Sequence, residues 1–218
     1  MELKTRKVLR LSAVNLAKVV EKSTDVLQKG GVLVYPTDTI YGLGGDPFQP
    51  ATVERIYKIK GRDFQNPIHV LIGSLEMLNQ LVDNVPDVVQ KLMRAFWPGP
   101  LTIIFKAKTS VQGRFLASDH TIGVRLPDHA FCRQLSTAFG KPILSTSANL
   151  SGGENPLSLE EVPAEIQQLV DLLVDERRLQ QSAPSTIVKV SNRHVRLIRE
   201  GAIPEERIEA VIGEMKNQ

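Results

Sequence analysis

The sequence predicts an α/β fold built around a mixed β-sheet. Segments with helical spacing of apolar residues alternate along the chain with short apolar runs that are typical of buried strands. A hairpin pattern within residues 186–199 adds antiparallel pairing to the sheet. The chain has 218 residues, 42% of them hydrophobic, which is enough to bury one sizeable core or at most two small ones. We therefore expect a single domain over residues 1–218.

The first hundred residues contain clear start and stop signals. Gly30 and Gly31 end an amphipathic helix, Pro36 terminates a buried strand, and the run Trp97-Pro98-Gly99-Pro100 breaks a later helix. The expected elements are a strand near 7–11, a helix from 12 to 29, a strand at 32–35, a loop at 37–45, a helix at 51–60, a strand at 68–72, and helices at 75–82 and 87–96.

The remainder of the chain continues the alternation. A strand at 143–145 is expected to lead into the loop Ser147-Ala148-Asn149, and Ser191-Asn192-Arg193 is expected to form the hairpin turn. The other expected elements are strands at 101–105 and 121–126, a helix at 130–139, a helix near 159–168, strands at 169–174, 186–190 and 195–199, and a terminal helix at about 204–215.

Composition narrows the function classes. Lys and Arg total 27 against 24 Asp and Glu, so the net charge of +3 does not indicate a dedicated nucleic-acid binder, although it leaves room for a local basic groove. The single cysteine, Cys132, cannot form an internal disulfide and suits a reducing compartment. No signal-peptide pattern and no bilayer-spanning stretch is visible, so we expect a cytoplasmic protein without membrane association.

Common nucleotide-binding and metal-binding motifs are missing. The sequence has no P-loop pattern, no Gly-x-Gly-x-x-Gly after a strand and no Gly-x-Ser-x-Gly elbow. Its four histidines show no spacing with cysteines or carboxylates that would hold zinc. A structural metal site is therefore not expected.

Three polar segments instead indicate chemistry. The loop from Pro36 to Gly45 carries hydroxyls, a carboxylate and a phenol after a buried strand, so it can wrap a small polar ligand or form an ordinary polar turn. Lys60 and Arg62 flank a glycine at a helix end, where they can bind an anion or simply complement the helix dipole. The segment from Ser145 to Gly153 is dense in hydroxyl groups, which suits phosphate or ribose oxygens or a helix cap.

Two arginines lie inside apolar strand patterns. Arg125 follows Ile122-Gly123-Val124, and Arg199 follows Leu197-Ile198. A buried guanidinium needs a carboxylate or phosphate partner, so each arginine is either a ligand-binding residue or half of a structural ion pair. On a strand, Glu200 points away from Arg199 and does not supply that partner.

The ordered combination of these segments resembles one family, the YrdC-like threonylcarbamoyl-AMP synthases. Its motifs match the loop from Pro36 to Gly45, Lys60-Gly61-Arg62, Trp97-Pro98-Gly99-Pro100-Leu101-Thr102, Val124-Arg125-Leu126-Pro127 and Ser147-Ala148-Asn149. The resemblance runs from about residue 31 to residue 201. It implies a twisted mixed sheet with flanking helices and a basic concave cavity in which ATP and L-threonine bind near one another.

The resemblance also implies roles for ten residues. The residues expected at the nucleotide are Lys60, Arg62, Thr121, Ser147, Asn149 and Arg199. The residues expected at threonine are Thr37, Arg125, Ser145 and Ser185. Lys60 and Arg62 would be the catalytic residues, and Arg125 suits the amino-acid carboxylate because a guanidinium can donate two parallel hydrogen bonds to it.

The implied reaction joins L-threonine, bicarbonate or CO₂, and ATP into threonylcarbamoyl-AMP and pyrophosphate, for the threonylcarbamoyladenosine modification of tRNA at A37. Mg²⁺ would arrive with the ATP phosphates, and the transfer to tRNA would need partner proteins. Two alternatives remain open: a carbamoyl-adenylate-forming enzyme, and a module that binds double-stranded RNA or tRNA without catalysis. Tight RNA binding that is steep in salt and indifferent to ATP would favour the module.

Two positions depart from the family pattern. Many relatives place a His in the strand after Asn-Pro where this chain has Leu71, whereas His69 lies two residues earlier and on the same face of a strand. Many relatives also have Pro after the Lys-x-Arg pair, where this chain has Asp63. The charge of Asp63 near the phosphates puts nucleotide affinity in question.

Overall fold

The described residues of this computed structural model are 8–180, 183–191 and 194–213. Their strands are β1 (Val8–Arg10), β2 (Leu33–Tyr35), β3 (Gly42–Gly45), β4 (Val70–Leu71), β5 (Leu101–Lys106), β6 (Thr121–Arg125), β7 (Ile143–Ser147), β8 (Leu172–Asp175), β9 (Thr186–Ser191) and β10 (His194–Arg199). Their helices are α1 (Leu16–Gln28), α2 (Pro50–Lys60), α3 (Leu75–Leu81), α4 (Asp87–Phe96), α5 (Ala130–Phe139), the 3₁₀ turn η1 (Leu159–Glu161), α6 (Ala164–Leu169) and α7 (Glu205–Ile212).

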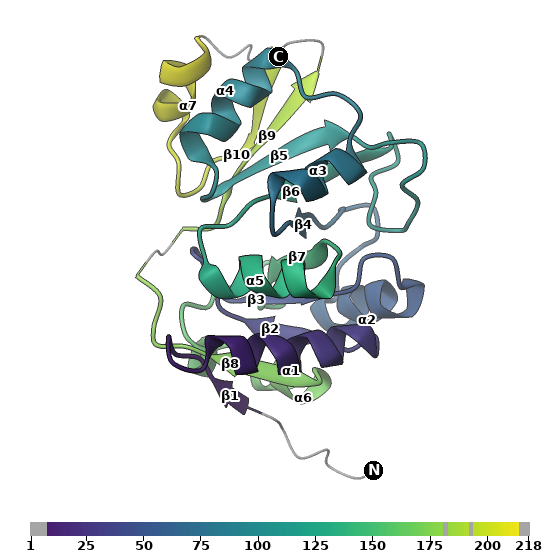
Figure 1. The fold of residues 1–218 in the computed structure, drawn as a ribbon, viewed down its shortest axis with the longest axis vertical. Coiled ribbons are helices and arrows are strands. Elements are labelled where there is room, and N and C mark those ends of the chain that lie inside the picture. Colours follow the sequence, from purple (N-terminus) through teal and green to yellow (C-terminus); the bar gives the residue numbers. More distant parts are fainter. Residues whose placement is uncertain (1–7, 181–182, 192–193, 214–218) are drawn as a thin grey trace.

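These strands join into one ten-stranded sheet in the order β1-β8-β2-β3-β7-β4-β6-β5-β9-β10 (Figure 1). The pairs β1–β8, β2–β8, β4–β6 and β5–β9 are parallel, and the other five neighbouring pairs are antiparallel. The predicted α/β fold with a mixed sheet and flanking helices is therefore confirmed.

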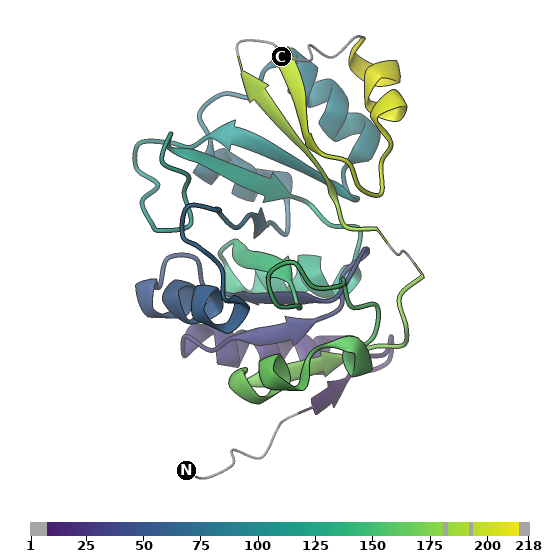
Figure 2. The same cartoon turned by 180° about the vertical axis from the view of Figure 1, so that it is seen from behind.

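Helices cover the sheet unevenly. In Figure 1, α1 and α5 lie over one face of the half that contains β2, β3 and β7, and Figure 2 shows α2 and α6 on the opposite face of that half. In the other half, α3 and α4 cover one face, with α7 beside α4 (Figure 1). The other face of β5 and β6 carries no helix in Figure 2.

Strand alternation decides what reaches this uncovered face. Along β5, Leu101 and Ile103 are fully buried in the larger apolar core, whereas Thr102 and Ile104 line a cavity on the other face. Along β6, Val124 belongs to the same core, while its neighbours in the strand line the cavity. Because successive side chains point to opposite faces, each strand contributes to the core and to the cavity at once.

The structure corrects two of the expected elements. The segment Gly42–Gly45, predicted as loop, is strand β3, paired antiparallel with β2 and with β7. A side chain at Gly44 would bring its Cβ within 2.2 Å of the Leu144 carbonyl oxygen, so the glycine permits this close approach. The single helix expected at 159–168 is instead η1 and α6, separated at Pro163.

Two further boundaries differ from the expected ones. Strand β7 continues two residues beyond the predicted end, so Ser147 closes the strand instead of opening the loop. The predicted hairpin turn includes residues 192–193 and the predicted end of the terminal helix includes residues 214–215, and these residues lie outside the described ones. Strands β9 and β10 on either side of that turn are paired antiparallel, as the hairpin pattern predicts.

Candidate active site

A cavity of about 160 Å³ opens at the junction of the two halves of the sheet. Pockets for small molecules usually measure roughly 300–1,000 Å³, so a ligand as large as ATP would extend from this cavity into its open mouth. Eight of the ten residues predicted from the sequence line it: Thr37, Arg62, Thr121, Arg125, Ser145, Ser147, Ser185 and Arg199. Lys60 and Asn149 do not, and their place is described below.

The floor of the cavity is one row of residues on adjacent strands. The backbone N–H of Ser145 on β7 donates to the carbonyl of His69, 2.9 Å away, at the start of β4. Gly123 on β6 lies against the other side of His69, because a Cβ built on Gly123 would be 3.0 Å from the His69 Cβ. The row continues to Ile104 on β5, which pairs with Gly123.

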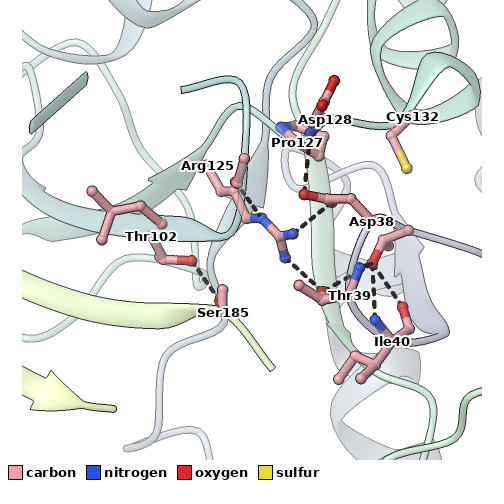
Figure 3. Close-up of polar contacts among 12 residues, drawn as sticks. Asp38, Thr39, Ile40, Thr102, Arg125, Pro127, Asp128, Cys132 and Ser185 are labelled. Carbon is pink, nitrogen blue, oxygen red and sulfur yellow. Dashed lines mark hydrogen bonds and ion pairs between the residues drawn. The ribbon is translucent and has the colours of Figure 1, made fainter. Parts of the chain in front are cut away.

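Arg125 has protein partners for three of its N–H groups (Figure 3). Its Nε donates to the carbonyl of Gly99 at 3.1 Å, Nη1 to Oγ1 of Thr39 at 3.0 Å, and Nη2 to Oδ1 of Asp38 at 2.5 Å. The Asp38 carboxylate also accepts from the backbone N–H of Asp128 at 3.1 Å. Both members of the ion pair are buried, with 4% of the Arg125 side chain and 11% of the Asp38 side chain exposed. The loop after β2 thus supplies the charge partner that the sequence required for Arg125.

Thr37 lines the cavity while its hydroxyl organises the loop. Its Oγ1 accepts from the backbone N–H groups of Thr39 and Ile40, at 3.1 and 3.2 Å, and donates to the carbonyl of Ile40 at 2.7 Å. The polar turn considered from the sequence is therefore present. It lies at the cavity wall, so it does not exclude ligand binding by the same loop.

Ser185 and Arg199 lie together on the opposite wall. The hydroxyls of Ser185 and Thr102 are 2.9 Å apart (Figure 3), and Nη2 of Arg199 donates to the carbonyl of Ser185 at 2.7 Å. Within the described part of the chain, Arg199 has no ion pair with a carboxylate. Burial, followed by the charges of Arg125 and Arg62, lowers the pKa of Arg199. An anion in the cavity would relieve this repulsion.

Lys60 and Asn149 form a buried network behind the wall. The ammonium of Lys60 donates to the carbonyls of Ser147 and Asn149, both at 2.7 Å, and to Oδ1 of Asn149 at 3.1 Å. Oγ of Ser147 also donates to this Oδ1, at 2.6 Å. Burial, followed by the charge of Arg62, lowers the pKa of Lys60 to about 8. Lys60 thus holds in place the end of β7, where Ser147 lines the cavity, together with the loop that follows.

Gly61 separates the directions of the two cations. It ends α2 with φ of 59°, a left-handed conformation that glycine adopts without strain. The chain turns there, so Lys60 points inward while Arg62 lies half-buried at the cavity rim and donates from Nε to the carbonyl of Asn66 at 2.9 Å. Thr121 also lines the cavity and donates to Oδ1 of Asp119 at 2.6 Å.

Sequence reasoning left four lining or supporting residues out of the site. Thr39 and Asp38 lie in the loop already singled out, and Thr102 lies in a quoted motif, so the motifs contained the signal for all three. His69 was noted only as a departure from the family pattern, and the structure places it in the cavity floor. The Asn-Pro strand pattern points to His69 as a residue on the same strand face as Leu71, and the pairing of β4 with β6 and β7 brings it to the cavity.

Among the residues that the structure describes, the lining carries the three guanidinium groups of Arg62, Arg125 and Arg199 and no carboxylate. In the part of the chain that the structure describes, no group of three His, Cys, Asp or Glu side chains is placed to hold a metal ion. No helix there combines the length and apolar character needed to span a lipid bilayer. The described part of the cavity lining thus combines guanidinium and hydroxyl groups.

The model of the Sua5, YciO and YrdC family, which is described as telomere recombination, matches residues 25–201. The chain belongs to the Sua5/YciO/YrdC family. A relative from Methanocaldococcus jannaschii, provisionally named threonylcarbamoyl-AMP synthase, is 33% identical over 202 residues, which cover 93% of this chain and 95% of the relative. The family resemblance read from the sequence motifs is thereby confirmed.

Two solved structures of this family share the fold. Pyrococcus abyssi Sua5, described as complexed with L-threonine, superposes with a TM-score of 0.90 at 30% identity over 98% of this chain. This chain spans only 62% of that Sua5 chain. Escherichia coli YciO superposes with a TM-score of 0.83 at 29% identity, over 94% of this chain and 98% of YciO.

Proposed function

We propose that this chain makes L-threonylcarbamoyl-AMP and pyrophosphate from L-threonine, bicarbonate or CO₂, and ATP. The product would supply the threonylcarbamoyl group for A37 of tRNA, in the cytoplasm and with partner proteins that transfer it. The observation that carries this proposal is the cavity that gathers eight of the ten residues predicted for ATP and threonine. The names of the family relatives and the threonine complex of P. abyssi Sua5 support it.

Arg125 is the residue we assign to the threonine carboxylate. A guanidinium has five N–H groups, and three of those in Arg125 donate to protein oxygens. The remaining two are one on Nη1 and one on Nη2, so each of these nitrogens keeps an N–H group for a carboxylate oxygen. Asp38 and Thr39 hold the guanidinium plane in place, which reduces the entropy lost when the substrate binds.

Arg62, Arg199 and Ser147 are the residues we assign to the phosphates of ATP. Both arginines line the cavity, as does Ser147 at the end of β7. Mg²⁺ would enter as the partner of the ATP phosphates, as it does at many phosphoryl-transfer sites. Lys60 then acts by fixing the positions of Ser147 and Asn149, in addition to the positive charge that it adds behind the wall.

The reaction needs no side-chain nucleophile. The threonine amine and bicarbonate give the carbamate and water, and a carbamate oxygen then attacks the α-phosphorus of ATP. The bond from the α-phosphorus to the bridging oxygen breaks, and pyrophosphate leaves with the electron pair. Fixed positive groups stabilise the charge that develops on the leaving oxygens. Alignment of the reactants alone contributes up to roughly 7–11 kcal/mol in favourable intramolecular cases.

The test is pyrophosphate release by the purified chain with Mg²⁺ and ATP, with L-threonine and bicarbonate each added and omitted. We expect release to require both, and mass spectrometry of the rapidly quenched reaction to detect the threonylcarbamoyl adenylate. Release that needs carbamoyl phosphate and not threonine would assign the chain to the carbamoyl-adenylate-forming class instead. Unchanged release together with tight, salt-steep RNA binding would assign it to the RNA-binding class.

A further inference from the structure

His69 occupies the centre of the cavity floor, between the residues assigned to threonine. Its carbonyl accepts from the Ser145 N–H at 2.9 Å, and its Cβ faces Gly123, which lies two residues before Arg125 on the same face of β6. Side chains on directly neighbouring strand positions lie about 5 Å apart. The imidazole therefore lies within reach of a ligand held by Arg125 and Ser145.

The imidazole ring of His69 is available to such a ligand. The residue is only partly buried, and it lines the cavity. Among the described residues, none forms a hydrogen bond with either ring nitrogen of His69, whereas the rings of His120 and His129 both have protein partners. The absence of a side chain at Gly123 leaves the space that the His69 side chain occupies, since a Cβ there would crowd it at 3.0 Å.

Partial burial and the surrounding positive charges together keep this imidazole neutral. Burial, then the charges of Arg125 on β6, Arg199 on β10 and Arg62 after α2, lower the pKa of His69 to about 3. A neutral imidazole offers one nitrogen as an acceptor, which a protonated one does not. When a carboxylate and phosphates bind the three arginines, their negative charges offset the field that opposes protonation of the ring.

We infer that His69 is the general base that deprotonates the ammonium group of the bound amino-acid substrate. This inference rests on the proposed function. In an amino acid the ammonium group is attached to the carbon next to the carboxylate, so a carboxylate on Arg125 leaves the ammonium near the cavity floor. The amine must lose a proton before its lone pair can attack bicarbonate or CO₂, and none of the residues assigned above removes that proton.

The proton balance is complete. One proton moves from the threonine ammonium to the free ring nitrogen of His69, and the neutral amine and bicarbonate then form the carbamate and water. After pyrophosphate leaves, the imidazolium returns its proton to solvent or to the departing anion. Once the anions have left, burial and the three guanidiniums again favour the neutral ring, which prepares it for the next turnover.

The test compares His69→Gln with His194→Gln, which makes the same change at an exposed position on β10. We expect His69→Gln to lower kcat for pyrophosphate release at pH 7 by at least about 100-fold, the lower end of the contribution of a general base. Threonine and ATP dissociation constants, measured by calorimetry, should change less than about threefold. His194→Gln should match the wild type.

Two further readouts separate a base from a structural role. With solvent as the only proton acceptor, the rate of His69→Gln should rise about tenfold per pH unit from pH 7 to 9, while the wild-type rate stays nearly flat. The variant His69→Ala should regain activity when imidazole is added. A loss that is equal at every pH and insensitive to imidazole overturns the inference, as does full activity of His69→Gln. A wild-type chain that needs neither threonine nor bicarbonate overturns the proposed function and this inference with it.

Discussion

Lys60 provides the most direct test of how the site is held together. The substitution Lys60→Met removes the ammonium group and keeps an unbranched apolar side chain of similar length. Lys60 is 2% exposed, and its ammonium donates to the carbonyl of Ser147 at the end of β7 and to two oxygens of Asn149 in the loop that follows. The variant therefore removes three hydrogen bonds and leaves the Ser147 and Asn149 carbonyls without the ammonium donor, while Oδ1 of Asn149 keeps the bond from the Ser147 hydroxyl.

The expected loss follows from two opposing quantities. Each hydrogen bond to a charged group contributes about 1.5–3 kcal/mol, so three contribute roughly 4–9 kcal/mol. The pKa of Lys60 falls from 10.5 to about 8, and this shift corresponds to a cost of roughly 3 kcal/mol for keeping the charged form in the folded chain. Removal of the ammonium also removes that cost. We expect Lys60→Met to lower the free energy of unfolding by about 3 kcal/mol.

The measurement is urea unfolding of the wild type and the variant, with equal slopes as the check that only stability changed. Lys58→Met is the matched control, because Lys58 lies on the same helix and is exposed. It should stay within about 0.5 kcal/mol of the wild type. If Lys60→Met unfolds at the same urea concentration as Lys58→Met, the three hydrogen bonds do not support the loop and the reasoning fails.

Three other outcomes are expected. Asp38→Asn leaves the buried Arg125 without its counter-charge and should lower the free energy of unfolding in urea by about 3–5 kcal/mol. Asp63→Asn, at an exposed position, should lower it almost not at all. Equal urea midpoints for the two variants would contradict a stabilising ion pair. Arg62→Ala should raise the KM for ATP in pyrophosphate release at least about tenfold. It should change the urea midpoint little, because the Arg62 side chain is half-exposed. An unchanged KM would remove Arg62 from the phosphate site. In the unfolded chain His69 becomes protonated below its ordinary pKa of 6.5, whereas in the folded chain its pKa is about 3. The free energy of unfolding should therefore fall as the pH falls through this window, by about 2 kcal/mol from pH 7 to 5 in the wild type relative to His69→Gln. An identical pH dependence of the two proteins would refute a neutral His69.

The sequence predicted most helices and strands because their local signals agree with the fold. Strand β3 was missed because Gly42–Gly45 contains no β-branched residue and only one large apolar one. Its strand conformation comes from backbone pairing with β2 and β7, which are distant from each other in the sequence. Single-sequence patterns carry no information about such a partner.

Arg125 illustrates how the site was only partly predictable. A charge within an apolar strand pattern indicated a ligand or an ion pair, and the structure supplies Asp38 as the ion-pair partner while leaving two N–H groups unused. Arg125 can therefore form an ion pair and still bind a ligand. The ion pair joins positions 87 residues apart, and no spacing rule in the sequence predicts such a contact.

The sequence by itself determined the fold class, the family motifs and the residue types of the site, because strand and helix periodicity and the motif order are local properties of the chain. Only the tertiary structure decided where the side chains of Lys60 and His69 lie. The turn at Gly61 sends the Lys60 ammonium to the oxygens behind the cavity wall, and the strand order places His69 between Ser145 and Gly123. Strand order and register depend on packing between segments that are distant in the sequence. The residues next to a side chain in the sequence therefore do not predict whether it lies in the wall or the floor of a cavity.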